Sequence, residues 1–301
     1  MLGYPKNLYL LPFDHRSSFI ESFFGSVKKL TPAQLKTIQA YKGLIFEAFL
    51  SAIKKTKFTT GVPAILVDEE FGLPILKAAK KKKVVFLLPV EKSGQQIFSF
   101  AHGRSFGTSI KSLKPDIVKA LVRFHPSIIK DKNNQIQLQN LATLSSFCQT
   151  NNYKLMIELL VPPSSADLKK FKNNREAFDR QLRPALTVQT IKEFQSSGIE
   201  PDIWKIEAME RSSDWPKVIT AIRSGEKRQS VSIIMLGRGE SFAKVKKWMD
   251  AAPKSELNGF AVGRTVFLRP LIDLHSGAIN KKQAIQQIAK NYLELVHYWQ
   301  R

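Results

Sequence analysis

Short apolar runs recur along the chain, and longer segments with a helical spacing of apolar positions separate them. Continuous apolar runs of this length are typical of parallel strands that are buried on both faces. The eight predicted strands are Leu8–Phe13, Ala64–Val67, Val84–Pro89, Ile117–Phe124, Leu155–Leu160, Ile203–Ile206, Val231–Leu236 and Gly259–Val262.

Helices are predicted between the strands, where apolar positions lie three and four residues apart. Their ranges are Pro32–Ile53, Leu73–Lys80, Gln137–Gln149, Leu182–Ser197, Trp215–Arg223, Phe242–Ala251 and Gln283–Tyr298. The first of these helices has Thr31 as its predicted N-cap and Pro32 as its first residue.

Eight strands that alternate with helices predict an α/β fold, the (β/α)8 TIM barrel. The 301 residues fit one such barrel, and no low-complexity linker or repeat divides them, so residues 1–301 are predicted to form a single domain. The segment Glu91–Lys114 breaks the alternation, because Gly94, Gly103 and Gly107 fall where a helix is expected. We expect it to form an excursion over the mouth of the barrel.

The chain carries 47 Lys and Arg residues against 25 Asp and Glu residues, which gives a formal net charge of +22. Such a surface attracts polyanions or phosphorylated small molecules, or it reflects a lysine bias with no partner behind it. The lysines are spread along the chain, and the densest run, Lys80–Lys83, follows a predicted helix. This distribution disfavours a nucleic-acid partner and favours the other two explanations.

Several classes of site have no support in the sequence. Cys148 is the single cysteine, which excludes an internal disulfide and a cysteine-rich metal centre. No run approaches the roughly 20 apolar residues of a membrane span, and Pro12 and Asp14 interrupt the apolar start. The five histidines lack metal-ligand spacing, and no P-loop, Rossmann or G-x-S-x-G motif occurs. We expect a soluble cytoplasmic protein with no metal, no cofactor and no membrane contact, in which Cys148 is packed in the interior.

Charged or glycine-rich segments lie at the end of every predicted strand. In chain order these ends carry Asp14-His15-Arg16, Asp68-Glu69-Glu70, Glu91-Lys92, Lys119 with Arg123 and His125, Glu158, Lys205 with Glu207, Gly237-Arg238-Gly239, and Gly263-Arg264. For any one of these residues, an ion pair at the rim is as good an explanation as a functional site. All eight together predict a polar site, because the carboxyl ends of barrel strands meet at one mouth.

Lys205 and Glu158 are the most informative of these residues. Each is flanked by apolar residues within its strand, in WKIE and MIELL, so alternation along the strand is expected to aim both side chains into the barrel. Burial and nearby cations favour the neutral form of an amine, and a neutral lysine can attack a carbonyl to form a Schiff base. Glu158 would then transfer protons. An ion pair of Lys205 with Glu158 or Glu207 is the alternative.

The pairs Gly237-Arg238 and Gly263-Arg264 predict a phosphate site. Glycine allows a close approach to backbone N–H groups, and arginine adds a bidentate cationic group. Many barrels hold a phosphate in the loops after strands seven and eight, where both pairs lie.

Seven segments resemble a known family. They are LYLLPFDHRSSF, VDEEFG, VEKSGQQIF, VKALVRFHP, WKIEAMERSSDW, NGFAVGRTVF and the closing YLELVHYW, and together they are similar to the C-terminal domain of bifunctional 5-dehydro-2-deoxygluconokinases. That domain is in turn similar to class I tagatose-bisphosphate aldolases. The resemblance covers nearly the whole chain, and DHR and FAVGRT are its most specific parts. No sugar-kinase domain precedes these segments, so we expect a separate polypeptide.

The resemblance implies a role for individual residues. The aldolases carry the Schiff-base lysine in an LKVE motif, and WKIE matches it at Lys205. Their EL motif matches Glu158 and implies an acid/base, their VK motif matches Lys119, and their closing GR motif matches Gly263-Arg264 at the phosphate. The loop after the seventh strand departs from the pattern, with LGRGES in place of an LG-L sequence.

The implied activity is that of a metal-independent class I aldolase in inositol breakdown. It would cleave 2-deoxy-5-keto-D-gluconate 6-phosphate to dihydroxyacetone phosphate and malonate semialdehyde. The expected catalytic residues are Lys205, Glu158, Lys119 and Asp14, and the expected substrate-binding residues are Arg16, Asp68, Arg123, Gly237, Arg238, Gly263 and Arg264. A non-catalytic barrel that binds sugar phosphates or nucleic acid is one alternative, and an aldolase or isomerase for another sugar phosphate is a second. The sequence leaves open whether the chain forms a homo-oligomer.

Overall fold

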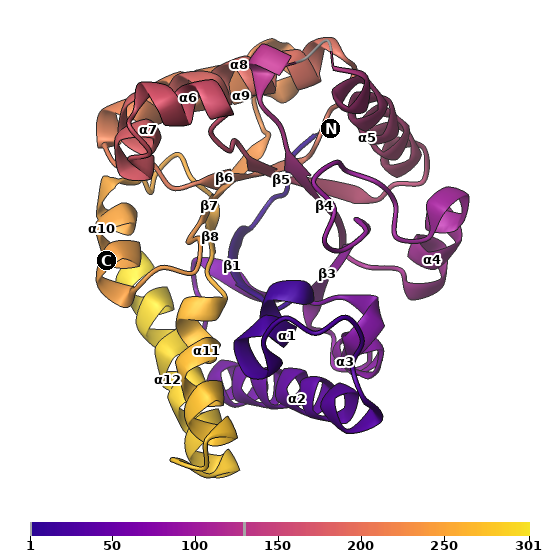
Figure 1. Cartoon of the computed structure of the whole chain (residues 1–301), viewed down its shortest axis with the longest axis vertical. Coiled ribbons are helices and arrows are strands. Elements are labelled where there is room, and N and C mark those ends of the chain that lie inside the picture. Colours follow the sequence, from indigo (N-terminus) through magenta and orange to yellow (C-terminus); the bar gives the residue numbers. More distant parts are fainter. Residues whose placement is uncertain (1, 129–130) are drawn as a thin grey trace.

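A computed structural model describes residues 2–128 and 131–301. Eight parallel strands pair in sequence order, and β8 pairs with β1, so the sheet closes into a barrel (Figure 1). The strands are β1 Asn7–Pro12, β2 Gly61–Leu66, β3 Val85–Pro89, β4 Ile117–Arg123, β5 Lys154–Leu160, β6 Ile203–Glu207, β7 Ser232–Leu236 and β8 Gly259–Ala261. The predicted (β/α)8 TIM barrel is confirmed, and each predicted strand overlaps the observed one.

The helices surround the ring of strands (Figure 1). They are α1 Ser17–Phe24, α2 Pro32–Lys55, α3 Glu69–Lys81, α4 Phe106–Leu113, α5 Lys132–Thr150, α6 Ser165–Lys170, α7 Arg175–Gln181, α8 Arg183–Ser196, α9 Trp215–Ile222, α10 Phe242–Ala251, α11 Arg264–His275 and α12 Lys281–Trp299. Short 3₁₀ turns lie at Gly103–Ser105, Pro126–Ile128, Ser212–Asp214 and Glu226–Arg228. In the part of the chain that the structure describes, none of the helices is long and apolar enough to cross a membrane.

The seven predicted helices are present, and Thr31 caps α2 as expected. The Thr31 hydroxyl accepts from the Gln34 amide, and the Gln34 side chain accepts from the Thr31 amide. Helices α1, α4, α6, α7 and α11 were not predicted. The segment Glu91–Lys114 is only partly irregular, because α4 forms within it.

Alternation along the strands divides the core into two parts. Leu8, Leu10, Met156 and Ile203 belong to a cluster of inward-pointing side chains that fills the barrel. The intervening strand residues pack outward against the helices in a larger cluster. Nearer the carboxyl ends of β4, β5 and β6, charged side chains take the place of apolar ones at the inward-pointing positions. These side chains are the ionisable groups of the mouth.

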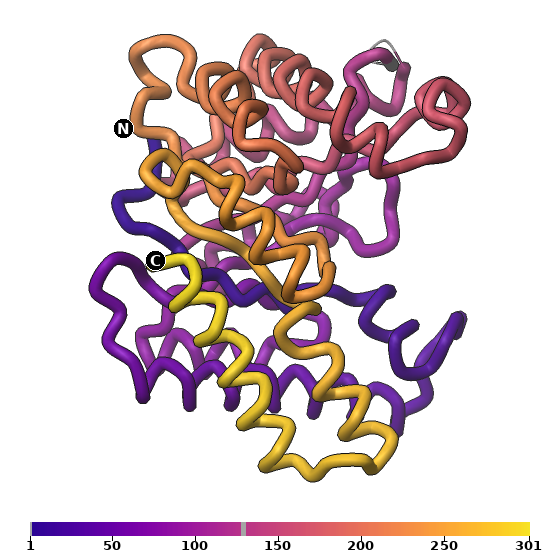
Figure 2. Tube along the Cα trace, turned by 90° about the vertical axis from the view of Figure 1, so that its left-hand side faces the viewer, coloured from indigo at the N-terminus to yellow at the C-terminus, as the bar shows by residue number. Residues whose placement is uncertain are grey.

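Two features away from the mouth complete the fold. Cys148 on α5 is buried, as predicted, and burial together with the nearby Asp202 carboxylate raises the pKa of its thiol to about 12. Helix α12 runs beside α2 and α11, and the two chain ends lie on the same side of the molecule (Figure 2).

Candidate active site

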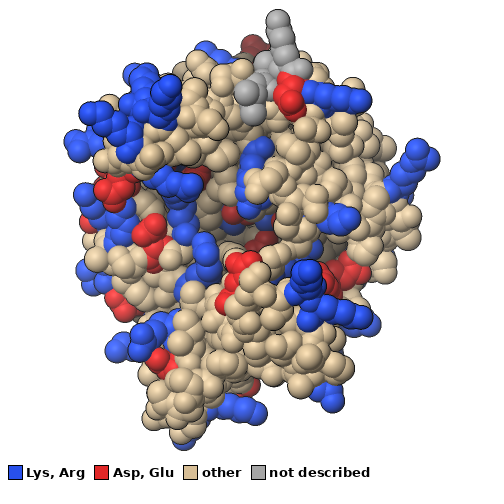
Figure 3. All heavy atoms as spheres, viewed as in Figure 1, with Lys and Arg blue, Asp and Glu red and all other residues tan. Residues whose placement is uncertain are grey.

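A cavity of about 670 Å³ opens at the carboxyl ends of the strands. Figure 3 shows the face that carries it, with a hollow at its centre and acidic and basic side chains inside. Its wall includes Asp14, His15 and Arg16 after β1, residues 91–98 after β3, Arg123, Glu158, Lys205, Glu207, Arg238, Gly263 and Arg264. Residues 90–102 are called the β3–α4 loop below, and residues 91–98 of this loop line the mouth, so only this part of the predicted excursion Glu91–Lys114 reaches the cavity.

Lys205 and Glu158 meet inside the barrel. The register pairs them across β5 and β6, and Lys205 Nζ lies 2.9 Å from Glu158 Oε1. Their side chains are 2% and 8% exposed. The ion pair that the sequence left as an alternative is therefore present, and in it the amine and a carboxylate are in proton-transfer contact.

Lys119 lies beside this pair, within reach of three carboxylates. Its Nζ is 2.9 Å from Asp14 Oδ2, 2.8 Å from Glu91 Oε1 and 2.8 Å from Glu158 Oε2. Burial opposes its charge, but the three carboxylates outweigh burial and hold the pKa of Lys119 well above its usual value. Lys119 is therefore a permanent cation at neutral pH.

The carboxylates of Asp14 and Glu158 are ionised in this state. Burial would raise the pKa of each, but Lys119 and Lys205 lower both pKa values below the usual range. Glu158 bridges both lysines, whereas Asp14 pairs with Lys119.

Three arginines on the wall have no carboxylate partner among the described residues. Arg16 donates to the Glu91 carbonyl at 2.8 Å, Arg123 donates to the Gln95 carbonyl at 3.3 Å, and Arg264 donates to the Arg238 carbonyl at 3.1 Å. The buried Nε of Arg264 has no hydrogen-bond partner. Because their charges are not neutralised, these guanidinium groups are suited to bind substrate anions.

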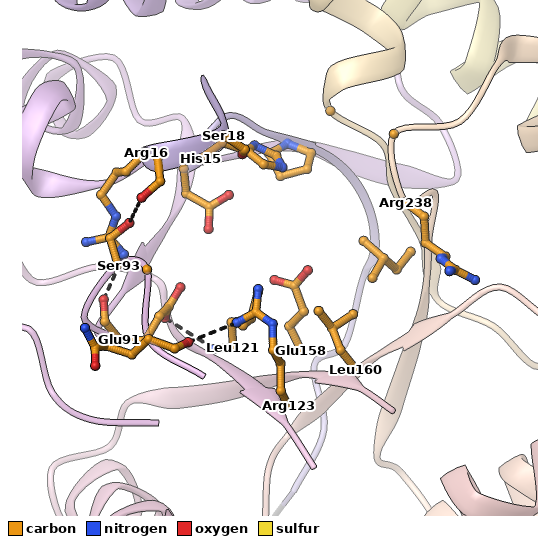
Figure 4. Close-up of a pocket in the computed structure, with 18 of the residues that line it drawn as sticks. His15, Arg16, Ser18, Glu91, Ser93, Leu121, Arg123, Glu158, Leu160 and Arg238 are labelled. Carbon is orange, nitrogen blue, oxygen red and sulfur yellow. Dashed lines mark hydrogen bonds between the residues drawn. The ribbon is translucent and has the colours of Figure 1, made fainter. Parts of the chain in front are cut away.

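Arg238 differs from these arginines. It lies on the wall opposite Arg16 (Figure 4). Its guanidinium pairs with Asp179 of α7 at 2.6 Å and with Glu207 of β6 at 3.3 Å. Its charge is therefore already neutralised, which does not support the predicted phosphate contact.

The two glycine pairs also differ. The Gly237 N–H is used in the barrel, where it donates to the Ala261 carbonyl at 3.0 Å, so this predicted phosphate donor is not free and Gly237 does not line the cavity. Gly263 does line it and caps the N-terminus of α11. A Cβ at Gly263 would lie 2.2 Å from the Pro12 carbonyl oxygen, so only glycine fits there.

Asp68 does not lie in the cavity, and the prediction that it binds substrate is wrong for this geometry. It caps α3 through the Phe71 amide and forms a fully buried ion pair with Lys42 of α2. Burial raises the pKa of Asp68 and lowers that of Lys42. Lys42 also donates to the His15 carbonyl at 3.0 Å, so the pair supports the β1 turn from behind.

Two residues of the site received no role from the sequence. Glu91 lies two residues after the end of β3 and contacts Lys119, and His15 lies between Asp14 and Arg16 with its Nδ1 buried and unpartnered. Burial lowers the pKa of His15 to about 4, so its ring is neutral. In the sequence, their position near the end of a predicted strand was the one feature that could have indicated a role for them. Among residues 2–128 and 131–301, no group of three His, Cys, Asp or Glu side chains is placed to hold a metal.

Residues 3–301 match the family model described as "Uncharacterized protein conserved in bacteria (DUF2090)". The chain belongs to the DUF2090 family. A search of curated proteins gives no match to this DUF2090 chain.

Solved structures share the fold of the DUF2090 chain. A Plasmodium falciparum fructose-bisphosphate aldolase, in complex with TRAP and an inhibitor, has a TM-score of 0.62 and 12% identity over 96% of this chain and 90% of its own. An archaeal fructose-1,6-bisphosphate aldolase, with its catalytic Lys bound to the carbinolamine intermediate, has a TM-score of 0.59 and 11% identity over 97% and 93%. A Schiff base-forming fructose-1,6-bisphosphate aldolase has a TM-score of 0.57 and 12% identity over 97% and 93%. Identities this low show a common fold alone.

Proposed function

We propose that this chain is a class I aldolase that cleaves a phosphorylated keto sugar acid through a Schiff base on Lys205. The observation that carries the proposal is the buried contact of Lys205 with Glu158, next to a second lysine whose charge three carboxylates hold. Imine formation requires an amine and a group that can take its proton, and a nearby cation can stabilise the charge that develops on the carbonyl oxygen.

The first step is proton transfer from Lys205 Nζ to Glu158 Oε1. The amine lone pair then attacks the substrate ketone, and the carbonyl oxygen takes up two protons, one from the attacking nitrogen and one from Glu158, and leaves as water. Glu158 is then a carboxylate again. Lys119 would stabilise negative charge on that oxygen as it develops. The resulting iminium ion withdraws the electrons of the C–C bond, and Glu158, with Asp14 as the second candidate, removes the proton of the hydroxyl group that becomes the aldehyde.

For 2-deoxy-5-keto-D-gluconate 6-phosphate, Lys205 would attack C5 and the C3–C4 bond would break. The products are dihydroxyacetone phosphate and malonate semialdehyde. Arg264, with the α11 N-terminus at Gly263, would bind the phosphate. Arg16 or Arg123, on the other side of the mouth, would bind the carboxylate.

Two observations support this assignment over a barrel that only binds sugar phosphates or nucleic acid. Lys119, Glu158 and Lys205 are buried inside the barrel, and the fold neighbours include an aldolase with a lysine-bound intermediate. Nucleic-acid binding needs no buried lysine, because its cations must reach the backbone phosphates.

Borohydride trapping with dihydroxyacetone phosphate tests the proposal. The Lys205→Met variant keeps the length of the side chain but cannot form an imine, so the covalent mass increase found in the wild-type chain is expected to disappear. Lys92→Met is the matched control, because Lys92 lies on the same wall and has no ion-pair partner among the described residues. Trapping on the Lys205→Met variant, or no trapping on the wild-type chain, would contradict the proposal.

A panel of keto sugar phosphates with and without a carboxylate then tests the substrate. Retro-aldol turnover is expected to be fastest with 2-deoxy-5-keto-D-gluconate 6-phosphate. Faster turnover of a bisphosphate that lacks a carboxylate would favour an aldolase for another sugar phosphate.

A further inference from the structure

Four contacts hold Glu91 in the mouth. Its Oε1 lies 2.8 Å from Lys119 Nζ, and its Oε2 accepts from the Leu121 amide at 3.3 Å. Its carbonyl accepts from Arg16 (Figure 4), and its backbone pairs with Phe100 across the β3–α4 loop. Because both carboxylate oxygens are engaged, the side chain is placed to act on Lys119 rather than on a substrate.

The three carboxylates around Lys119 are not equivalent. A lysine ammonium has three N–H donors, and Asp14, Glu91 and Glu158 take one each. Glu158 is the one carboxylate in the described chain that also contacts Lys205. Glu158 therefore has two roles that conflict. When it accepts a proton from Lys205, its carboxylate becomes neutral and no longer balances the charge of Lys119.

We propose that Glu91 is a positioning residue that holds Lys119 while Glu158 carries the proton of Lys205. This inference rests on the proposed aldolase function. With Glu158 protonated, Asp14 and Glu91 still supply two negative charges to the ammonium. Lys119 then stays charged and in place, and Glu158 can return its proton to the oxygen of the attacked carbonyl.

The position of Glu91 also bears on Glu158. Both carboxylates contact the Lys119 ammonium, and Lys205 contacts the other oxygen of Glu158. A negative charge at Glu91 opposes the negative charge of Glu158 and so favours its protonation, which the proposed first step requires.

Glu91→Gln removes the charge and keeps the size. We expect kcat to fall about 10- to 100-fold with little change in KM, and the initial rate of borohydride trapping with dihydroxyacetone phosphate to fall in parallel. The alkaline limb of the trapping-rate pH profile should move to lower pH, because the loss of a negative charge makes it easier to remove the proton that Lys205 and Glu158 share. Glu91→Asp keeps the charge and should keep the limb near its wild-type position, even if its rate is lower.

Glu21→Gln is the control, since Glu21 faces the same cavity and has no ion-pair partner among the described residues. A Glu91→Gln profile that coincides with that of Glu21→Gln would overturn the inference, and so would a limb that moves as far in Glu91→Asp as in Glu91→Gln. Failure of the proposed function is a separate result, because the wild-type chain itself would then not be trapped. Circular dichroism of each variant confirms the fold before the rates are compared.

Discussion

Lys42 and Asp68 show how a single buried pair can support a site that it does not enter. Both side chains are fully buried, and Lys42 Nζ lies over the rings of Phe19 and Phe71. Lys42→Met would leave the Asp68 carboxylate buried without its cation, so we expect the free energy of unfolding to fall by about 3–5 kcal/mol. Urea denaturation monitored by circular dichroism measures this loss.

Lys246→Met provides the comparison. Lys246 pairs with Glu294 at 2.6 Å, but their side chains are 30% and 40% exposed, so a loss of about 1 kcal/mol or less is expected. Equal losses of unfolding free energy in the two variants would show that burial does not make the Lys42–Asp68 pair more sensitive to removal of its cation.

The depressed pKa of His15 predicts how stability depends on pH. The pKa of His15 is about 4 in the folded chain, whereas the pKa of a histidine in an unfolded chain is about 6.5. Between these values the unfolded state binds more protons, so stability is lost as the pH falls from 7 to 5, by roughly 2 kcal/mol from this group. His15→Gln should lose correspondingly less over that range in urea titrations at both pH values. A loss equal to that of the wild-type chain would mean that His15 is protonated in the fold.

Some site residues could be predicted from sequence, and others could not, for physical reasons. Lys205 and Glu158 stand out because a charge inside an apolar strand must have a partner within the barrel. Asp68 occupies a similar strand end, but its partner Lys42 lies on a helix, where nothing in the local sequence marks a lysine as buried. Gly237 was misassigned because the sequence does not reveal that its N–H is already bonded to Ala261.

At the scale of elements, strands were easier to predict than the helices at the mouth. A buried parallel strand is apolar on both faces, so its position is visible in the sequence. Helices α1, α4 and α11 begin after Arg16, Ser105 and Gly263 without a side-chain cap, so they lack the usual start signal. Helices α6 and α7 have caps but are only six and seven residues long.

The ion pairs of Asp179 predict how α7 is held at the mouth. Asp179 accepts from Arg183 at 2.9 Å and from Arg238 at 2.6 Å, which ties α7 to α8 and to the loop after β7. Asp179→Ala should raise amide exchange in α7 by roughly tenfold, since it removes both charge-assisted hydrogen bonds. Hydrogen exchange with mass spectrometry measures this change. Glu176→Ala, on an exposed side chain of the same helix, is the control, and an equal increase there would rule out the tether.

At the scale of the whole molecule, the net charge of +22 and the arginines of the mouth make separable contributions. Salt screens repulsion over the entire surface, whereas an anion bound at Arg264 stabilises only the folded state. Inorganic phosphate should therefore raise the melting temperature more than sodium chloride at the same ionic strength. A ligand at 100 times its Kd contributes about 2.7 kcal/mol.

Arg264→Ala distinguishes the two contributions. This variant should lose the phosphate-specific increase in melting temperature and keep the response to sodium chloride. A phosphate effect that persists unchanged in the variant would place the anion elsewhere on the basic surface.

The inert thiol of Cys148 has a practical consequence. A buried sulfur with a pKa near 12 forms almost no thiolate at neutral pH and reacts slowly with maleimides. A cysteine introduced at the exposed Gln96, in the part of the β3–α4 loop that lines the mouth, would therefore be the preferred target for a fluorophore without removal of the native cysteine. The emission of that dye would report movement of the loop as substrate enters, because the native thiol of Cys148 would carry almost no dye.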